Sequence, residues 1–297
     1  MNTEGGLRLL VTGAGGLLGG RLATLLHADG FGVVGGRHAA GLPPGILETP
    51  LDLLDPGSVA RALEATRPEA VLHAAVLQAD ACEARPAEAD ALNHRATGSL
   101  ARACRAGGLR LVVLSTDLVF AGDRPFVSEE HAARPIQTYG RTKLAGEDAA
   151  LAAHPDAAVA RVTLVVGRGH GPRGTASEAI AWALRAARPL RLFTDEYRTP
   201  VDPESVARGV ALLLRGKATG RFHLGGPERV SRYELGLRAA RALGLRTDGI
   251  EAARQADHVG PARPPDVSLD ITRARRELGW TPRPLDEVLP EGRAQPG

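Results

Sequence analysis

The chain has 297 residues, of which 43% are hydrophobic and 24% charged, and its net charge is +3. This composition is ordinary for a globular protein, and the length fits one large α/β domain or two smaller ones. Basic and acidic residues are interspersed and only 3% of residues are aromatic, which argues against a nucleic-acid-binding protein. The sequence has neither a long apolar run nor a leader pattern, so we expect no membrane association and a cytoplasmic location.

The two cysteines of the chain, Cys82 and Cys104, form no Cys-x-x-Cys motif and have no cluster of histidines near them. The sequence therefore predicts neither a disulfide scaffold nor a metal site. We expect both thiols to be buried as small apolar side chains in a reducing compartment.

The first motif combines an apolar segment, a glycine-rich turn and a helical pattern. Residues 7–11 (LRLLV) are typical of a buried parallel strand, and residues 17–28 have helical periodicity. Three glycines form the pattern GxxGxxG, two of them in the turn and the third in the helical segment. This spacing allows a tight turn and the close approach of a pyrophosphate to the helix N-terminus. The predicted cofactor-binding residues of this motif are Gly13, Gly16, Leu17, Leu18 and Gly19.

The next strand, predicted over residues 31–36, ends without the acidic residue that often binds the ribose 2′-hydroxyl of NAD. Arg37 follows instead, and a guanidinium suits the 2′-phosphate of NADPH. The alternative is that Arg37 is a solvated loop residue in an Arg-rich chain. We predict NADPH as the cofactor, with NADH as the alternative.

Two further segments complete the predicted cofactor site. Asp52 and Leu53 follow a short predicted strand, where the carboxylate would face the adenine amino group. Ala74 and Ala75 follow the fourth predicted strand, and their small side chains would let a ribose approach closely. Asn93 lies in the middle of the next helical pattern, where it is either a polar anchor or a surface residue.

Tyr139 and Lys143 lie four positions apart in a segment with a helical pattern, so they share one helix face. A cation that favours the phenolate lowers the pKa of a tyrosine and makes it a usable proton donor. Only two of the 37 Lys and Arg residues are Lys, so the pairing is not expected by chance. The apolar strand over residues 109–114 leads into Ser115 and Thr116, and a hydroxyl there would hydrogen-bond the same substrate oxygen.

Strands alternate with helices from residue 7 onward, which predicts an α/β fold with a doubly wound parallel sheet, the Rossmann architecture. We assign residues 1–165 to a dinucleotide-binding core, with later segments returning to it. Residues 166–290 are assigned mainly to a small C-terminal substrate lobe, and residues 291–297 to a disordered tail.

Several motifs together resemble one enzyme superfamily. The motifs TGAGGLLG, HAA, STDLVFAG and YGRTKLAGE are similar to those of the extended short-chain dehydrogenase/reductases, most of all the dTDP-4-dehydrorhamnose reductase branch. By that resemblance Thr116 is the catalytic hydroxyl, Tyr139 the proton donor, and Lys143 its pKa-lowering, ribose-binding partner. The resemblance also implies NADPH-dependent reduction of a nucleotide-linked 4-keto-6-deoxy sugar, and a homodimer.

The substrate region departs from that branch. Its members usually carry a Trp after the catalytic helix where this chain has Leu164, and residues 168–174 (RGHGPRG) replace an Asn-rich stretch. This loop either orders over an anionic diphosphate through Arg168 or Arg173, or is a mobile surface loop. The predicted substrate residues are Thr116, Asp117, Arg168 and Arg198.

Two alternatives remain open. The same three catalytic residues serve NAD-dependent nucleotide-sugar epimerases and dehydratases. Dehydratases place an Asp-Glu pair beside the hydroxyl, whereas here Thr116 is followed by Asp117 and Leu118. Other relatives of the branch are non-catalytic regulatory subunits that bind NADP and a partner protein. The intact set of Thr, Tyr and Lys favours an enzyme.

Overall fold

The computed structural model describes residues 6–291, and its centre is a seven-stranded sheet in the order β3-β2-β1-β4-β5-β6-β9. Every neighbouring pair in this sheet is parallel, which confirms the predicted doubly wound Rossmann architecture. In sequence order the strands are β1 (Arg8–Thr12), β2 (Gly32–Arg37), β3 (Leu47–Pro50), β4 (Ala70–His73), β5 (Arg110–Thr116), β6 (Ala158–Val162) and β9 (Gly220–Leu224).

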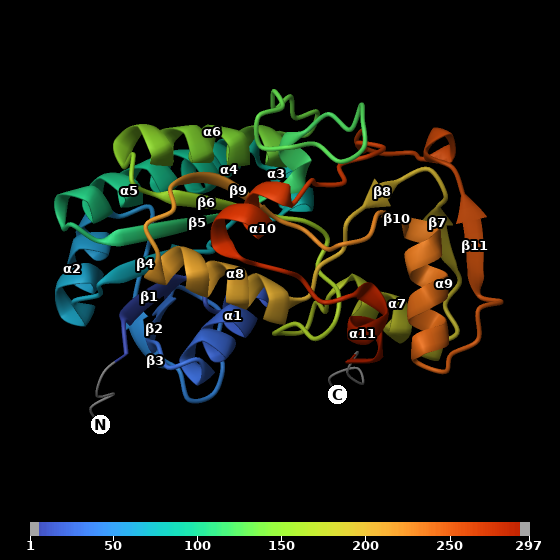
Figure 1. Ribbon diagram of the computed structural model, residues 1–297, viewed down its shortest axis with the longest axis horizontal. Coiled ribbons are helices and arrows are strands. Elements are labelled where there is room, and N and C mark those ends of the chain that lie inside the picture. Colours follow the sequence, from blue (N-terminus) through green and yellow to red (C-terminus); the bar gives the residue numbers. More distant parts are fainter. Residues whose placement is uncertain (1–5, 292–297) are drawn as a thin grey trace.

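Helices cover both faces of the sheet (Figure 1). Leu9 and Val11 of β1 pack into the layer formed with α1 and α8, whereas Leu10 between them packs into the opposite layer. Alternate side chains of a strand point to opposite faces, so a run of apolar residues is needed wherever both faces are covered. One layer contains α1 (Leu17–Ala28), α8 (Pro203–Arg215) and α10 (Thr272–Leu278), and the other contains α2 (Pro56–Thr66), α5 (Thr97–Ala106) and α6 (Thr138–Ala153).

Between β4 and α5 the chain forms three short helices in succession. They are α3 (Ala79–Ala84), α4 (Pro86–Ala89) and the π-helix η1 (Asp90–Ala96). The long helical pattern of this region is thus broken, and its middle is wound as a π-helix, a form that is often found at functional sites.

The remaining elements form a second lobe beside the sheet (Figure 1). Its own apolar cluster joins α7, α9, α11 and the two-stranded β7–β11 sheet. The elements are α7 (Ala176–Arg185), β7 (Leu190–Phe193), β8 (Tyr197–Arg198), β10 (Val230–Ser231), α9 (Arg232–Ala242), β11 (Ile250–Ala253) and α11 (Leu285–Val288). Three 3-10 turns accompany them and the core: η2 (Asp117–Val119), η3 (Gln255–Asp257) and η4 (Leu289–Glu291).

The chain enters this lobe after β6 and returns to the main sheet with α8 and β9. The lobe is therefore discontinuous in sequence. Residue 291 closes η4, and the rest of the predicted tail, residues 292–297, lies outside the described residues. Over residues 6–291 no helix is both long and apolar enough to cross a membrane.

A buried ion pair joins α6 to the sheet. The carboxylate of Glu147 accepts hydrogen bonds from Arg161 of β6 at 2.7 Å and from Arg221 of β9 at 2.8 Å, and Ser115 of β5 donates to the same carboxylate. The side chains of Glu147 and Arg161 are 0% and 2% exposed. Burial by itself raises the pKa of Glu147, but the hydrogen bonds and charge of Arg161 outweigh it and hold the pKa below its usual value.

Glu147→Gln is expected to destabilise the fold strongly, because it leaves the buried Arg161 guanidinium without its carboxylate. The expected loss is about 3 kcal/mol or more of unfolding free energy, measured by denaturant titration. The control is Glu69→Gln, which breaks the half-exposed pair with Arg8 and should cost less than about 1 kcal/mol. Equal losses in the two variants would contradict this account of α6.

Candidate active site

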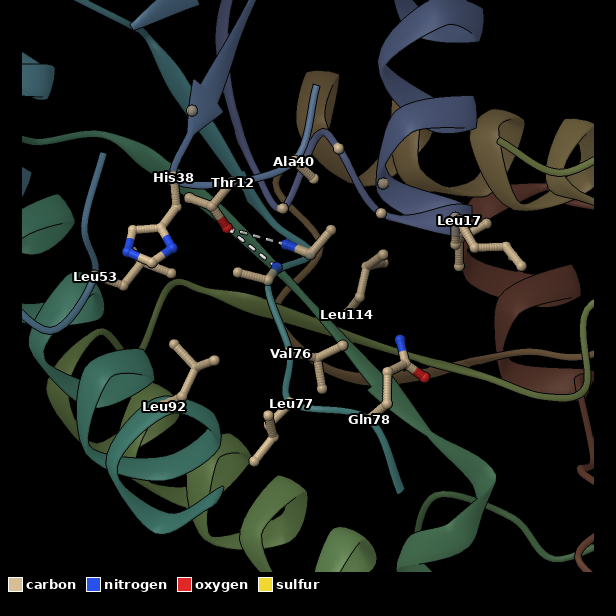
Figure 2. A pocket seen from close by; sticks show the side chains of 18 of the residues that line it. Thr12, Leu17, His38, Ala40, Leu53, Val76, Leu77, Gln78, Leu92 and Leu114 are labelled. Atoms are coloured by element: carbon tan, nitrogen blue, oxygen red, sulfur yellow. Dashed lines mark hydrogen bonds between the residues drawn. The ribbon is translucent and has the colours of Figure 1, made fainter. Parts of the chain in front are cut away.

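A cleft of about 780 Å³ lies along the carboxyl ends of the parallel strands. Thr12 ends β1, Ala74 follows β4 and Thr116 ends β5, and all three line the cleft. Figure 2 shows Thr12 among the lining residues. This edge of a parallel sheet is where α/β proteins generally bind their ligands. The cleft is lined by the three predicted catalytic residues and by all predicted cofactor residues except one: Gly13, Gly16, Leu17, Leu18, Gly19, Asp52, Leu53, Ala74, Ala75, Thr116, Tyr139 and Lys143.

The glycine turn after β1 has no room for side chains. A Cβ on Gly13 would lie 2.5 Å from the nitrogen of Ala75, and one on Gly19 would lie 2.3 Å from the carbonyl oxygen of Gly13. Gly13 also has a φ of +68°, in the region that favours glycine. Gly16 caps α1 without a side-chain hydrogen bond, so the first N–H groups of the helix are open to an anion. The turn thus fits the pyrophosphate of a dinucleotide.

Thr12 fixes the chain that leaves β4. Its hydroxyl contacts Nδ1 of His73 at 2.8 Å and accepts hydrogen bonds from the nitrogens of Ala74 and Ala75 at 3.2 and 3.3 Å (Figure 2). The other ring nitrogen of His73 contacts the Thr97 hydroxyl at 3.0 Å. Sequence reasoning missed Thr12, although its place directly before the first glycine of the turn was a usable signal.

Asn93 is a polar anchor rather than a surface residue. Its side-chain oxygen accepts from the nitrogen of Leu77 at 2.8 Å, and its amide nitrogen donates to the carbonyl of Leu77 and to the Thr142 hydroxyl, each at 3.2 Å. Asn93 thereby ties the cleft wall after β4 to helix α6. Its side chain reaches these partners from the π-helix η1.

The three predicted catalytic residues come from two neighbouring elements. Thr116 ends β5, while Tyr139 and Lys143 lie one turn apart on α6. The Lys143 ammonium is buried and donates to the carbonyl oxygen of Leu114 at 2.7 Å. The Thr116 hydroxyl donates to the carboxylate of Asp117 at 3.0 Å.

The pKa of Tyr139 differs from the sequence-based expectation. Burial raises it above its usual value, the charge of Asp117 raises it further, and the Thr116 hydroxyl opposes both. The predicted lowering by Lys143 is wrong for the protein by itself, because the ammonium is directed at the Leu114 carbonyl and burial dominates. Burial also lowers the pKa of Lys143 to about 8, although the charge of Glu147 raises it.

Two predicted substrate residues, Asp117 and Arg198, pair with each other behind the cleft. Arg198 Nε lies 3.7 Å from Oδ2 of Asp117, and both side chains are 6% exposed. Burial raises the pKa of Asp117, although the charge of Arg198 lowers it. Since Arg198 belongs to β8, this contact joins the second lobe to the residue that follows Thr116.

Three arginines from the sequence predictions have different surroundings. Arg37 lies outside the cleft lining and pairs with Glu48 of β3 at 3.0 Å, while the adjacent His38 lines the cleft (Figure 2). Arg168 is exposed and does not line the cleft, whereas Arg173 of the same loop does. Arg37 and Arg168 are therefore not among the residues that line the cleft with the other predicted site residues.

Both cysteines are buried free thiols, as expected. Within residues 6–291 no group of three or more His, Cys, Asp or Glu side chains is placed to hold a metal ion.

His73 is expected to make stability depend on pH in a defined window. Burial and then the charge of Lys143 lower its pKa to about 3, against about 6.5 in the unfolded chain. Between these values only the unfolded state binds the proton, so unfolding free energy should fall as the pH drops below 6.5. His73→Gln should remove a contribution of about one proton from the pH dependence measured by denaturant unfolding from pH 7 to 4, while His223, whose pKa burial also lowers to about 3, keeps its own contribution. A change as large in His258→Gln, at an exposed position, would refute this assignment.

Known proteins similar to this chain include reductases and a subunit of another enzyme. The probable low-salt glycan biosynthesis reductase Agl14 of Haloferax volcanii is 33% identical over 291 residues, covering 94% of this chain and 95% of the relative. The dTDP-4-keto-6-deoxy-D-glucose reductase of Streptomyces niveus is 32% identical, with coverages of 93% and 92%. The β subunit of methionine adenosyltransferase 2 from Rattus norvegicus is 30% identical, with coverages of 90% and 81%.

A solved structure and a family description agree with this similarity. The structure of a hypothetical dTDP-4-dehydrorhamnose reductase from Sulfolobus tokodaii has a TM-score of 0.82 at 28% identity, and the match covers 94% of this chain and 98% of that one. The family described as the RmlD substrate binding domain matches residues 7–294. Because this match spans nearly the whole chain, the protein belongs to the RmlD substrate binding domain family.

Proposed function

We propose that this protein is an NADPH-dependent reductase of the keto group of a nucleotide-linked 4-keto-6-deoxy sugar. The observation that carries the proposal is the meeting of Thr116, Tyr139 and Lys143 in one cleft that is also lined by the glycine turn, where Gly13 and Gly19 have no room for a Cβ. Such a cleft suits a dinucleotide whose nicotinamide lies beside the three side chains. The similarity to two reductases, one named for a dTDP-4-keto-6-deoxy sugar, supports carbonyl reduction.

In the proposed reaction the nicotinamide supplies a hydride to the carbonyl carbon. Tyr139 gives its proton to the carbonyl oxygen, which becomes a hydroxyl, and the Thr116 hydroxyl hydrogen-bonds that oxygen. The raised pKa of Tyr139 keeps the phenol protonated, the form that a proton donor requires. Lys143 binds the cofactor ribose and favours the phenolate that remains after proton transfer.

We further propose that Arg198 binds the diphosphate of the nucleotide sugar, for which its buried guanidinium would exchange the Asp117 carboxylate for the diphosphate. Arg263 Nε lies 2.6 Å from Glu196 and Arg198 lies 3.2 Å from the same carboxylate. Arg232 adds a third guanidinium, whose pKa burial lowers to about 10. Three guanidinium groups share the two carboxylates of Glu196 and Asp117, so the group has a positive charge to offer a diphosphate.

Arg37 stays our proposed ligand of the 2′-phosphate. Its pair with Glu48 is about half exposed, and such pairs contribute little to stability, so a phosphate can compete for the guanidinium. Asp52 is proposed to face the adenine. The proposal also includes a homodimer in the cytoplasm, which the family resemblance supports and sedimentation of the purified protein would test.

A second candidate is a subunit of another enzyme that binds the dinucleotide without turnover. The similarity to the β subunit of methionine adenosyltransferase 2 favours it. NADPH binding with no consumption in the presence of any keto sugar would support this candidate. An epimerase would instead retain NAD through purification.

Tyr139→Phe is expected to remove turnover while leaving the cofactor bound. Wild-type protein should consume NADPH, followed by absorbance, only when a dTDP-4-keto-6-deoxy sugar is added. The variant should lose a factor of about 10² to 10⁴ in kcat, because the proton donor is gone, with the Kd for NADPH unchanged. The control is Tyr233→Phe on α9, outside the cleft lining. Near-normal turnover in Tyr139→Phe would contradict the assignment of Tyr139 as the proton donor.

Arg37→Ala is expected to weaken the binding of NADPH about tenfold and to leave the binding of NADH unchanged, because only NADPH has the 2′-phosphate. Glu48→Gln should have the opposite effect and strengthen the binding of NADPH, because it releases the Arg37 guanidinium from its ion pair with Glu48. Calorimetric titration with both cofactors measures the two effects. If the NADPH preference survives Arg37→Ala but disappears in His38→Gln, the 2′-phosphate is bound by the neighbouring histidine instead.

A further inference from the structure

The loop over residues 168–174 folds against the start of α1. The nitrogen of His170 donates to the carbonyl oxygen of Leu17 at 3.0 Å. A Cβ on Gly20 would lie 2.4 Å from the His170 ring, and one on Gly169 would lie 3.2 Å from Cγ of Leu17. The loop therefore lies on the first turn of α1, next to the glycine turn of the predicted cofactor site.

Both ends of this loop are anchored. The Thr175 hydroxyl donates to the carbonyl oxygen of Gly167 at 2.6 Å, and the nitrogen of Gly167 donates to the Ser177 hydroxyl at 2.9 Å. Thr175 and Glu178 form a reciprocal capping box at the start of α7. The loop is thus held across the first turn of α1 by its own hydrogen bonds and by the helix that follows it.

Arg173 brings an uncommitted positive charge to the cleft. It lines the cleft, is exposed, and makes no ion pair within the described part of the chain. Among residues 6–291 the only other Lys or Arg in the lining is Lys143, whose ammonium donates to the Leu114 carbonyl. A dinucleotide carries two charged phosphates, and the glycine turn offers them only neutral N–H groups.

We propose that Arg173 binds the pyrophosphate of the dinucleotide, so that the loop over residues 168–174 belongs to the cofactor site. Its guanidinium adds a charged, forked donor to the N–H groups of the first turn of α1. The sequence had suggested this loop for the diphosphate of the substrate, but its contacts with Leu17 and Gly20 place it on the cofactor's side of the cleft. The proposal rests on the dinucleotide binding proposed above.

The test is the binding of four probes to the purified full-length protein: NADPH, NADH, ADP-ribose and dTDP. The first three share an internal pyrophosphate that joins two riboses, dTDP carries a terminal diphosphate instead, and only NADPH has a 2′-phosphate. Arg173→Ala should weaken the binding of NADPH, NADH and ADP-ribose by the same factor, about tenfold, and should leave the binding of dTDP unchanged. Arg173→Lys should recover part of the loss, and added salt should narrow the difference from wild type.

The matched control is Arg168→Ala, which removes an exposed arginine from the same loop that does not line the cleft. Three results would overturn the proposal: a loss confined to NADPH, a loss confined to dTDP, or the same loss in Arg168→Ala. Unchanged binding of all probes to Arg173→Ala would do so as well. Wild-type protein that binds no dinucleotide would refute this proposal together with the proposed function, whereas wild-type binding without turnover leaves this test intact.

Discussion

The arrangement at the reacting end of the cleft depends on the buried carboxylate of Glu147. It lies one helical turn after Lys143 and two turns after Tyr139, and it receives Arg161, Arg221 and the Ser115 hydroxyl from three adjacent strands. A buried carboxylate is stable only while such partners surround it. Rotation or sliding of α6 would break these bonds. The requirement to pair Glu147 therefore also fixes the direction in which the phenol and the ammonium point.

The same burial determines the charge states in the cleft. Protein packed around Tyr139 raises its pKa, so the ring is neutral and protonated before reaction. Burial lowers the pKa of Lys143 to about 8, although Glu147 is close enough to oppose this with its charge. Near neutral pH the lysine is then a cation that is held by a backbone carbonyl instead of a carboxylate. This charge state fits the role proposed for Lys143, which is to favour the phenolate of Tyr139.

Local patterns carried the sequence-based predictions that the structure confirms. The predicted bounds of the first helix, residues 17–28, agree with α1, and the fourth strand ends directly before Ala74 as predicted, because each pattern depends on near neighbours. The convergence of Tyr139 and Lys143 needs only the helical repeat. Their meeting with Thr116 depends in addition on the packing of α6 against β5, where Lys143 donates to the Leu114 carbonyl.

The features that the sequence did not reveal depend on distant partners. Arg37 pairs with a residue of the next strand, and Asp117 pairs with Arg198 across the two lobes. The hydrophobic periodicity of one segment does not reveal which side chain of a distant segment will pair with it in the fold. The prediction of a lowered pKa for Tyr139 was wrong for the same reason, because the pKa is raised by burial and burial depends on the whole fold. The docking of residues 168–174 on α1 likewise depends on glycines that lie far away in the sequence.

Residue 143 is a Lys in a chain that uses Arg for almost every other cation, and the chemistry of the site explains this choice. All but two of the 37 Lys and Arg residues are Arg, yet the cation in the helix face beside Tyr139 is Lys. Arg161 is equally buried but faces the carboxylate of Glu147, where a permanently charged fork is well matched. Lys143 faces only the Leu114 carbonyl, where a guanidinium would be larger and could not lose its charge. A compact ammonium with a lowered pKa tolerates that position, and Lys143 still lines the cleft together with Tyr139.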